Sequence, residues 1–181
     1  MAGLAAVQRP EGAAEPAGSD VFSVDRYWPG RALRHLVIDT ARMQLRAARA
    51  EDVGAIVVMD PGRLGIPEQI QALIHDQASL VAVEHGEIAG FLVLKPGHFY
   101  GRDFIDLLFV ARRWRRHGTG RALIQAALQN AATSRVFVST NESNTPMREL
   151  LRSEGWTPSG VLTGLDEDDP EHVFFHDLPP R

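Results

Sequence analysis

The sequence predicts a single α/β domain of the α+β type, in which helices flank a central sheet. Short apolar runs typical of strands alternate along the chain with stretches whose apolar residues recur at helical spacing. One junction is especially informative, because the strand-like run 104–110 leads through a turn with Gly118 and Gly120 into a helix-like stretch. A chain of 181 residues is long enough for one domain with one well-filled core.

The elements before residue 100 are indicated by periodicity and by residues that begin or end elements. Pro67 begins the stretch 67–75, whose apolar residues fall on one face, so a helix is expected there. The apolar runs 80–83 and 88–94 are separated by Glu84-His-Gly-Glu87, which is typical of a hairpin turn. We therefore expect two consecutive strands, with the two glutamates of the turn exposed to solvent.

Similar signals predict the elements after the strand 104–110. The apolar positions 123, 124, 127, 128 and 131 recur at helical spacing and should form one buried stripe. The stretch that begins at Asn144 has Pro146 near its start and Gly155 just past its end, as expected of a helix. The remaining expected elements are a strand at 134–140 and a closing hairpin of 160–165 and 173–175 around the acidic turn 166–170.

The glycine turn between strand and helix is typical of an anion site. Backbone N–H groups at a helix start lack partners, and the helix dipole adds positive potential there. Gly118 and Gly120 have no Cβ, so a phosphate can approach the backbone closely. Neither the GxxxxGK[ST] spacing of a P-loop nor the three-glycine dinucleotide fingerprint is present, and Lys95 is the only lysine. We predict that the turn binds a pyrophosphate.

The turn resembles a known binding motif. Arg115-Arg-His-Gly118-Thr-Gly120 follows the pattern R/Q-x-x-G-x-G/A and resembles the acyl-CoA-binding motif of the GNAT superfamily of N-acetyltransferases. The stretch 144–156 is similar to the family's second signature, N-x-x-A-x-x-L-Y-x-x-x-G-F, and the segment 43–52 resembles the family's opening strand and helix start. The resemblance covers residues 43–177 and implies a mixed, mostly antiparallel sheet that is splayed at the acyl-CoA site.

The resemblance implies an acyltransferase that transfers an acetyl group from acetyl-CoA directly to an amine. The turn would bind the pyrophosphate, the backbone of strand 104–110 would pair with the pantetheine arm, and Asn144 would orient that arm near the thiol. The backbone N–H of Val110 is the candidate donor to the oxyanion. The expected cosubstrate-binding residues are Phe109, Val110, Arg115, Arg116, His117, Gly118, Thr119, Gly120, Arg121 and Asn144.

Two side chains are candidates for proton transfer. The acceptor amine must react in its neutral form, so a base is needed. Asp106 is the candidate base, since strand alternation places it on the face of Val110; the alternative is a carboxylate that only stabilises the split in the sheet. The family commonly has a tyrosine on the last helix to protonate the thiolate, and Leu151 stands at that position. Tyr100 is the candidate substitute, and solvent is the alternative.

The acceptor is expected to be a small amine or a peptide N-terminus. The acidic run 166–169 suggests a cationic acceptor, and the alternative is a solvated hairpin tip. Two other functions stay open: a catalytically inactive regulatory protein that binds acyl-CoA, and a nucleic-acid-binding module that uses the arginines at 112–121 with Trp114. The net charge of −4 argues against nucleic acid as a partner.

The remaining composition fits a cytoplasmic protein. No stretch approaches the length of a membrane span, and no signal-peptide core is evident near the N-terminus. The absence of cysteine excludes a thiol nucleophile, and the seven histidines show no metal-ligand spacing, so no metal site is expected. Residues 1–20 are expected to be disordered. The aromatic-containing segment 21–42 is expected to be a strap on the domain or on a partner subunit of a homodimer, unless Met43 is the true start.

Overall fold

The computed structural model describes residues 38–39, 43–59, 66–76 and 78–179. The expectation for residues 1–20 lies outside the described residues, and so does that for 21–42 apart from the short strand at 38–39. None of the helices in these described ranges is long and apolar enough to cross a membrane.

In the part of the chain that the structure describes, eight strands form one mixed sheet in the order β1-β2-β3-β4-β5-β6-β8-β7. Neighbouring strands are antiparallel except β5 and β6, which are parallel. The strands are β1 (Ile38–Asp39), β2 (Met43–Ala47), β3 (Ala78–Glu84), β4 (Glu87–Phe99), β5 (Arg102–Val110), β6 (Arg135–Asn141), β7 (Thr157–Leu162) and β8 (Glu171–Asp177). The expected α/β architecture with a central mixed, mostly antiparallel sheet is therefore confirmed.

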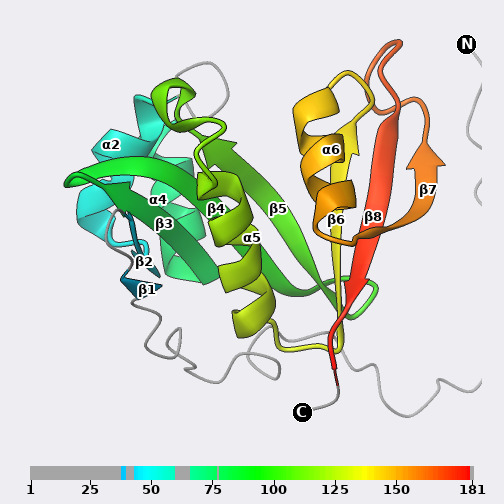
Figure 1. The fold of residues 1–181 in the computed structure, drawn as a ribbon, viewed down its shortest axis with the longest axis horizontal. Coiled ribbons are helices and arrows are strands. Elements are labelled where there is room, and N and C mark those ends of the chain that lie inside the picture. Colours follow the sequence, from blue (N-terminus) through cyan, green and yellow to red (C-terminus); the bar gives the residue numbers. More distant parts are fainter. Residues whose placement is uncertain (1–37, 40–42, 60–65, 77, 180–181) are drawn as a thin grey trace, which may run out of the picture.

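Helices cover both faces of the sheet (Figure 1). Among the described residues the helical elements are η1 (Ala50–Asp52), α2 (Val53–Val57), α4 (Pro67–Asp76), η2 (Arg112–Trp114), α5 (Thr119–Asn130) and α6 (Thr145–Ser153). Alternate residues of β4 enter two separate cores: Leu92 and Leu94 pack with α5 on one face, and Phe91 and Val93 pack with α2 and α4 on the other. We call these the α5 face and the α2/α4 face.

The stripe expected on α5 is mostly confirmed, since Leu123, Ile124, Ala127 and Ala131 are fully buried. Close packing of this helix depends on Gly90 of β4. A Cβ at Gly90 would lie 2.8 Å from Leu123 Cδ1 and 3.0 Å from the carbonyl oxygen of Phe109. The absence of a side chain there lets the first turn of α5 lie directly on the sheet.

The sheet is splayed between β5 and β6. These strands pair over only three residues, Asp103 to Ile105 opposite Val136 to Val138, although β5 continues to Val110. Beyond this point the strands diverge, with α5 beside one and α6 beside the other (Figure 1). The sheet therefore has two arms that are joined at a closed end and separate toward the N-termini of α5 and α6.

A β-bulge lies next to the splay. The register of β4 and β5 shifts between Val93, which pairs with Leu107, and Leu94, which pairs with Ile105. Asp106 therefore has no residue opposite it on β4. Bulges interrupt the alternation of a strand and redirect a side chain, often beside active sites.

Candidate active site

The free edge of β5 presents backbone groups to the gap between the arms. Ala111 N–H donates to the Ala89 carbonyl at 2.9 Å. The neighbouring pair Gly90 and Val110 is therefore a non-hydrogen-bonded pair of the antiparallel ladder. The N–H and C=O groups of Val110 point away from β4 and toward the gap. By the same alternation Leu108 faces the gap, whereas Phe109 bonds to β4. Val110 is thus placed as expected, Phe109 contributes no backbone group to the gap, and Leu108 is a residue that the sequence interpretation missed.

The start of α5 provides further donors at the open end of the gap. Gly118 is the N-cap, with φ of 91°, and the first helical bond runs from Ala122 N–H to its carbonyl at 2.9 Å. The N–H groups of residues 119–121 therefore have no acceptor within the helix. A Cβ at Gly120 would lie 3.3 Å from Leu150 Cδ2 and 3.6 Å from Val110 Cγ2. The absence of a side chain at Gly120 thus lets α5, α6 and β5 approach one another closely.

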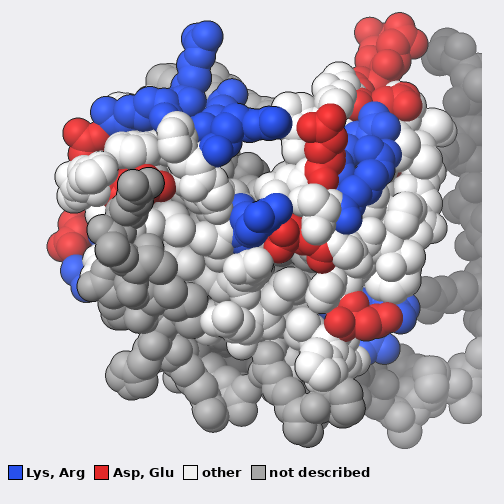
Figure 2. All heavy atoms as spheres, viewed as in Figure 1, with Lys and Arg blue, Asp and Glu red and all other residues white. Residues whose placement is uncertain are grey.

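Basic side chains surround this turn, as Figure 2 shows over η2 and the start of α5. Arg115 donates from Nε to the Val110 carbonyl at 3.0 Å, so it lies directly over the β5 edge. Arg116, strongly exposed, reaches across the gap to Glu149 of α6 with an N–O distance of 3.9 Å. Arg121 instead pairs with Glu154, the C-cap residue of α6, at 2.6 Å. Its expected contact with the pyrophosphate would require it to leave that partner.

A buried carboxylate supports the glycine turn 115–120, which we call the phosphate turn. Glu84, at the end of β3, is only 7% exposed, and its Oε1 accepts the hydroxyl of Thr119 at 2.8 Å. The expectation that Glu84 is solvated was therefore wrong: the turn of its hairpin is covered by the loop before α5. Thr119 is 1% exposed, so its side chain supports the turn from inside and is not free to face a phosphate.

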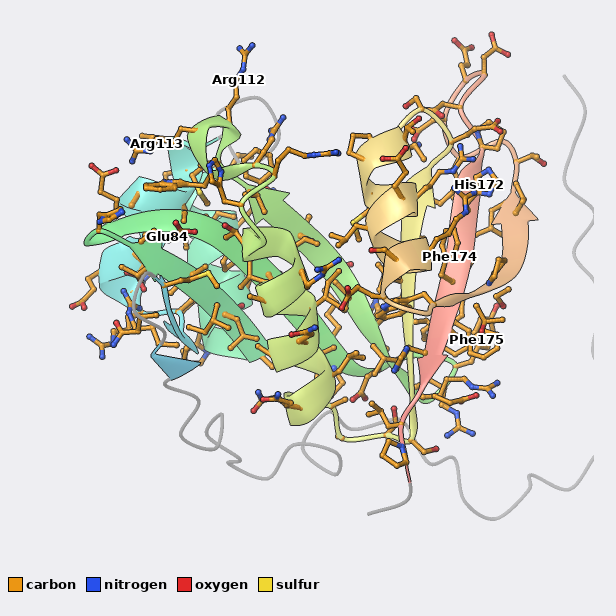
Figure 3. The ribbon with its side chains drawn as sticks, in the orientation of Figure 1. Glu84, Arg112, Arg113, His172, Phe174 and Phe175 are labelled. Atoms are coloured by element: carbon orange, nitrogen blue, oxygen red, sulfur yellow. The ribbon has the colours of Figure 1, made fainter. Side chains whose placement is uncertain are left out.

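Two more contacts join the hairpin to the loop 111–118; Figure 3 labels Glu84 at the hairpin and Arg113 on this loop. Glu87 pairs with Arg113, and His85 stacks on Trp114 with ring centroids 5.8 Å apart. Trp114 also packs against the core, so it is not a free platform for stacking bases. His117 contacts the Arg115 carbonyl through Nδ1 at 2.9 Å, which fits a residue that stabilises the turn.

Asp106 lies on the α2/α4 face rather than on the face of Val110. Its Oδ2 is 2.8 Å from Nζ of Lys95, which follows Leu94 of the α5 core and so points to the other face. The expected common face of Asp106 and Val110 was therefore wrong, because the bulge at Asp106 interrupts the alternation. The carboxylate still lies at the residue where β5 parts from β6, and no sequence signal indicated its pairing with Lys95.

Tyr100 lies away from the gap. It occupies the turn between β4 and β5 with φ of 50°, is 94% exposed, and contacts the edge of the Phe99 ring. At about 3.3 Å per residue, six residues of strand separate it from Asp106 by roughly 20 Å. The structure does not bring Tyr100 to the site as a proton donor.

The last helix places its two motif residues in structural positions. Asn144 caps α6: its Oδ1 accepts the Met147 N–H at 3.4 Å, and its Nδ2 donates to Thr140 Oγ1 at 3.0 Å. Its expected role toward the pantetheine arm stays a prediction. Leu151, at the position of the family's tyrosine, is fully buried in the core.

Part of the acidic run has a structural role. Asp169 accepts both the N–H and the hydroxyl of Ser143, at 2.9 and 2.7 Å, and Asp166 accepts from Asn141 Nδ2 at 2.8 Å. These hydrogen bonds, chiefly from Ser143, hold the pKa of Asp169 below its ordinary value. They fix the loop between β7 and β8 against the start of α6. Within the described ranges, no group of three or more His, Cys, Asp or Glu side chains could hold a metal ion.

Comparison with known proteins identifies the class. The profile of the Acetyltransferase (GNAT) family matches residues 46–156, more than half of the chain, so the chain belongs to this family. The donor substrate of the family is acetyl-CoA. The splayed sheet, the free edge of β5 and the glycine turn at the start of α5 lie within the matched region.

Solved structures show the same fold. An acetyltransferase of the GNAT family from Bacillus cereus is 29% identical with a TM-score of 0.70, and the match covers 76% of this chain and 99% of that one. The ribosomal-protein-S18-alanine N-acetyltransferase from Escherichia coli is 12% identical with a TM-score of 0.65, covering 77% and 96%. A proposed streptothricin acetyltransferase from Bacillus anthracis, in complex with acetyl coenzyme A, is 23% identical with a TM-score of 0.52, covering 57% and 64%. No curated protein matches.

Proposed function

We propose that this protein is an N-acetyltransferase that transfers the acetyl group of acetyl-CoA directly to a primary amine. One observation carries the proposal: the unpaired edge of β5 and the N-terminus of α5 face one gap, so amide-pairing groups and phosphate-binding groups lie end to end. This order matches acetyl-CoA, in which the diphosphate is followed by an amide-rich arm and then the thioester. The gap also lacks any cysteine, which fits direct transfer.

Each part of the gap has a distinct task in binding the donor. The N–H groups of residues 120 and 121 and the positive end of the helix dipole receive the diphosphate, and Arg115 and Arg116 add charge. Arg116 exchanges its exposed partner Glu149 for the phosphate. The N–H groups of Leu108 and Val110 pair with the arm or donate to the thioester oxygen, whose negative charge grows as the amine attacks.

The acceptor approaches from the α2/α4 face. On the α5 face, α5 and α6 contact each other through Arg121 and Gln125, which both bind Glu154. The opposite face of the gap carries Asp106 at the point of divergence. In our proposal Asp106 takes one proton from the acceptor ammonium, the neutral amine attacks and forms the C–N bond, and the C–S bond breaks as the nitrogen loses its second proton to solvent. With leucine at position 151, solvent protonates the departing thiolate.

Two measurements test the proposal. CoA should raise the melting temperature of the protein, and free thiol should appear when acetyl-CoA is mixed with a suitable primary amine. Arg115→Ala should weaken CoA binding by about 1–3 kcal/mol, with a smaller loss at high salt. Arg152→Gln, which removes an exposed arginine elsewhere on α6, is the matched control.

The outcomes separate the alternatives. CoA binding without turnover of any amine would favour the regulatory acyl-CoA-binding protein. Stabilisation by single-stranded nucleic acid but not by CoA would favour the arginine-patch module and would contradict our proposal.

A further inference from the structure

Four phenylalanines form a line across the sheet outside both cores. Phe99, Phe104, Phe137 and Phe175 come from β4, β5, β6 and β8, and each is only partly buried. Their ring centroids are 5.4 Å apart for Phe99 and Phe104, 4.7 Å for Phe99 and Phe137, and 5.9 Å for Phe137 and Phe175. Neither core cluster of the described residues includes them. We call this line the aromatic ledge.

The aromatic ledge is continuous with the charged pair at the bulge. Phe104 lies directly opposite Lys95 on β4 and directly opposite Phe137 on β6, so all three side chains share the α2/α4 face. Lys95 in turn contacts Asp106, and the side chains of this pair are 21% and 27% exposed. A carboxylate, an ammonium and an apolar surface therefore adjoin one another on one face, at the point where β5 and β6 part.

We infer that the acceptor is a free α-amino acid with a large apolar or aromatic side chain. This inference rests on the proposed acetyltransferase function. Its ammonium would lie at Asp106, its carboxylate at Lys95, and its side chain over Phe104 and Phe137. The chain's only lysine thus lies where a negative group on the acceptor would be needed.

The argument for a zwitterion comes from what happens to the ion pair on binding. An acceptor ammonium that engages Asp106 displaces Lys95 from its partner. If the acceptor has no carboxylate, the displaced ammonium of Lys95 stays half-buried without a partner, which is costly. A zwitterion exchanges one ion pair for two, so neither charge of the protein loses a partner. Polar groups left unpaired are an effective means of rejecting a substrate analogue.

The exchange also prepares the reaction. Once Lys95 has moved to the substrate carboxylate, Asp106 is in contact with the substrate ammonium alone and can accept its proton. The neutral nitrogen then attacks the thioester carbon and the C–N bond replaces the C–S bond. The nitrogen loses its second proton to solvent, solvent protonates the thiolate, and the products are the N-acetyl amino acid and CoA. No further reactant is required.

The experiment compares matched acceptors by the release of free thiol from acetyl-CoA. We expect kcat/KM for L-phenylalanine to exceed that for phenethylamine and for L-phenylalaninamide by about 10- to 100-fold, because only the amino acid pairs with Lys95. Lys95→Met should abolish this preference, whereas Lys95→Arg, which keeps the charge, should retain most of it. Arg152→Gln, which removes a distant charge, should leave the preference unchanged.

The role of the aromatic ledge is tested by the preference for large over small amino acids. For the wild-type protein we expect L-phenylalanine and L-leucine to be better acceptors than L-alanine, and Phe104→Ala should reduce the ratio of kcat/KM between L-phenylalanine and L-alanine. A ratio measured on one preparation does not depend on the fraction that is folded. A merely structural Phe104 would lower both rates and leave the ratio unchanged.

The failures of the two proposals are distinguishable. If phenethylamine, phenylalaninamide or spermidine is acetylated as well as or better than L-phenylalanine, the amino-acid inference is overturned while the acetyltransferase function stands. If Lys95→Met keeps the wild-type preference, Lys95 does not bind the carboxylate and the inference is likewise overturned. If no amine of any kind releases thiol while CoA still binds, the proposed function itself fails.

Discussion

At Asp106, strand β5 has one residue more than its partner β4, and this changes which face the carboxylate occupies. Strict alternation would have placed it with Val110 on the α5 face, where α5 and α6 leave little access. The bulge turns it to Lys95 on the opposite face, from which the acceptor approaches in our proposal. The sequence identified Asp106 through its position in the strand, but it could not show the bulge, because no residue type marks an inserted position.

If Asp106 is the base, Asp106→Asn should lower kcat/KM by about 100-fold or more at neutral pH, since general base catalysis contributes factors of this size. The dissociation constant of CoA should stay the same, because the substitution leaves the β5 edge and the α5 start in place. Steady-state kinetics across pH with two acceptors of different amine pKa separate ionisation of the enzyme from that of the amine. An acidic limb that persists unchanged in Asp106→Asn would assign a structural role to the carboxylate.

At the scale of elements, the turn at 84–87 and the phosphate turn act as one unit. Three contacts join them, and the central one buries the carboxylate of Glu84 against Thr119. The sequence predicted both turns from their glycines and apolar flanks, which are local signals. It could not predict the contact, because its partners are 35 residues apart and each has an ordinary local role.

Thr119→Val should both destabilise the protein and weaken CoA binding. The substitution keeps the shape of the side chain but leaves Glu84 buried without its donor, at a cost of about 1–3 kcal/mol in the free energy of unfolding. The start of α5 then loses its anchor, so the affinity for CoA should fall. Thr119→Ser, which keeps the hydroxyl, should remain close to wild type in denaturant unfolding and in CoA titration. Equal behaviour of the valine and serine variants would show that the hydrogen bond does not position the turn.

A second connection between elements gives a pH-dependent prediction. Asp52, 6% exposed, accepts hydrogen bonds from the Arg46 guanidinium at 2.7 and 2.8 Å and from the Arg49 N–H at 2.8 Å. Burial raises the pKa of Asp52, but these hydrogen bonds and the two positive charges together lower it below its ordinary value of 3.8. The contact is therefore strongest with the carboxylate ionised, and it fastens β2 to the start of α2.

A carboxyl whose pKa is lower in the folded state stabilises the protein above the unfolded pKa and loses this effect as pH falls through the folded value. Asp52→Asn should therefore reduce the free energy of unfolding by about 3 kcal/mol at pH 7. The difference from wild type should begin to shrink below about pH 4, where the Asp52 carboxyl of the unfolded chain becomes protonated, and be lost as pH falls through the lower pKa of the folded state. Denaturant unfolding at several pH values measures this, and a difference that is constant down to strongly acidic pH would contradict it.

For the whole molecule, the essential feature is a sheet with two arms. The arms meet at a closed end, where Asp103, completely buried, accepts N–H groups from Gly97 on β4 at 3.1 Å and from Thr133 before β6 at 3.2 Å. On the α5 face they meet again through Arg121 and Glu154. The resemblance of the two motifs predicted that the sheet is splayed, but the residues that limit the splay are polar groups with no local pattern.

These two connections should contribute very differently to stability. Asp103→Asn replaces one accepting oxygen with an NH₂ group that faces N–H donors, so the free energy of unfolding should fall by about 2–4 kcal/mol. Glu154→Gln removes an ion pair whose arginine is half exposed, and it should cost about 1 kcal/mol or less.

For CoA binding, Glu154→Gln should have the opposite effect and raise the affinity of the folded protein. Arg121, freed from Glu154, can then turn to the phosphates. Denaturant unfolding and calorimetric titration with CoA test both statements. A Glu154→Gln variant with weakened CoA binding would show that the contact between α5 and α6 holds the gap open in the binding geometry and does not compete for Arg121.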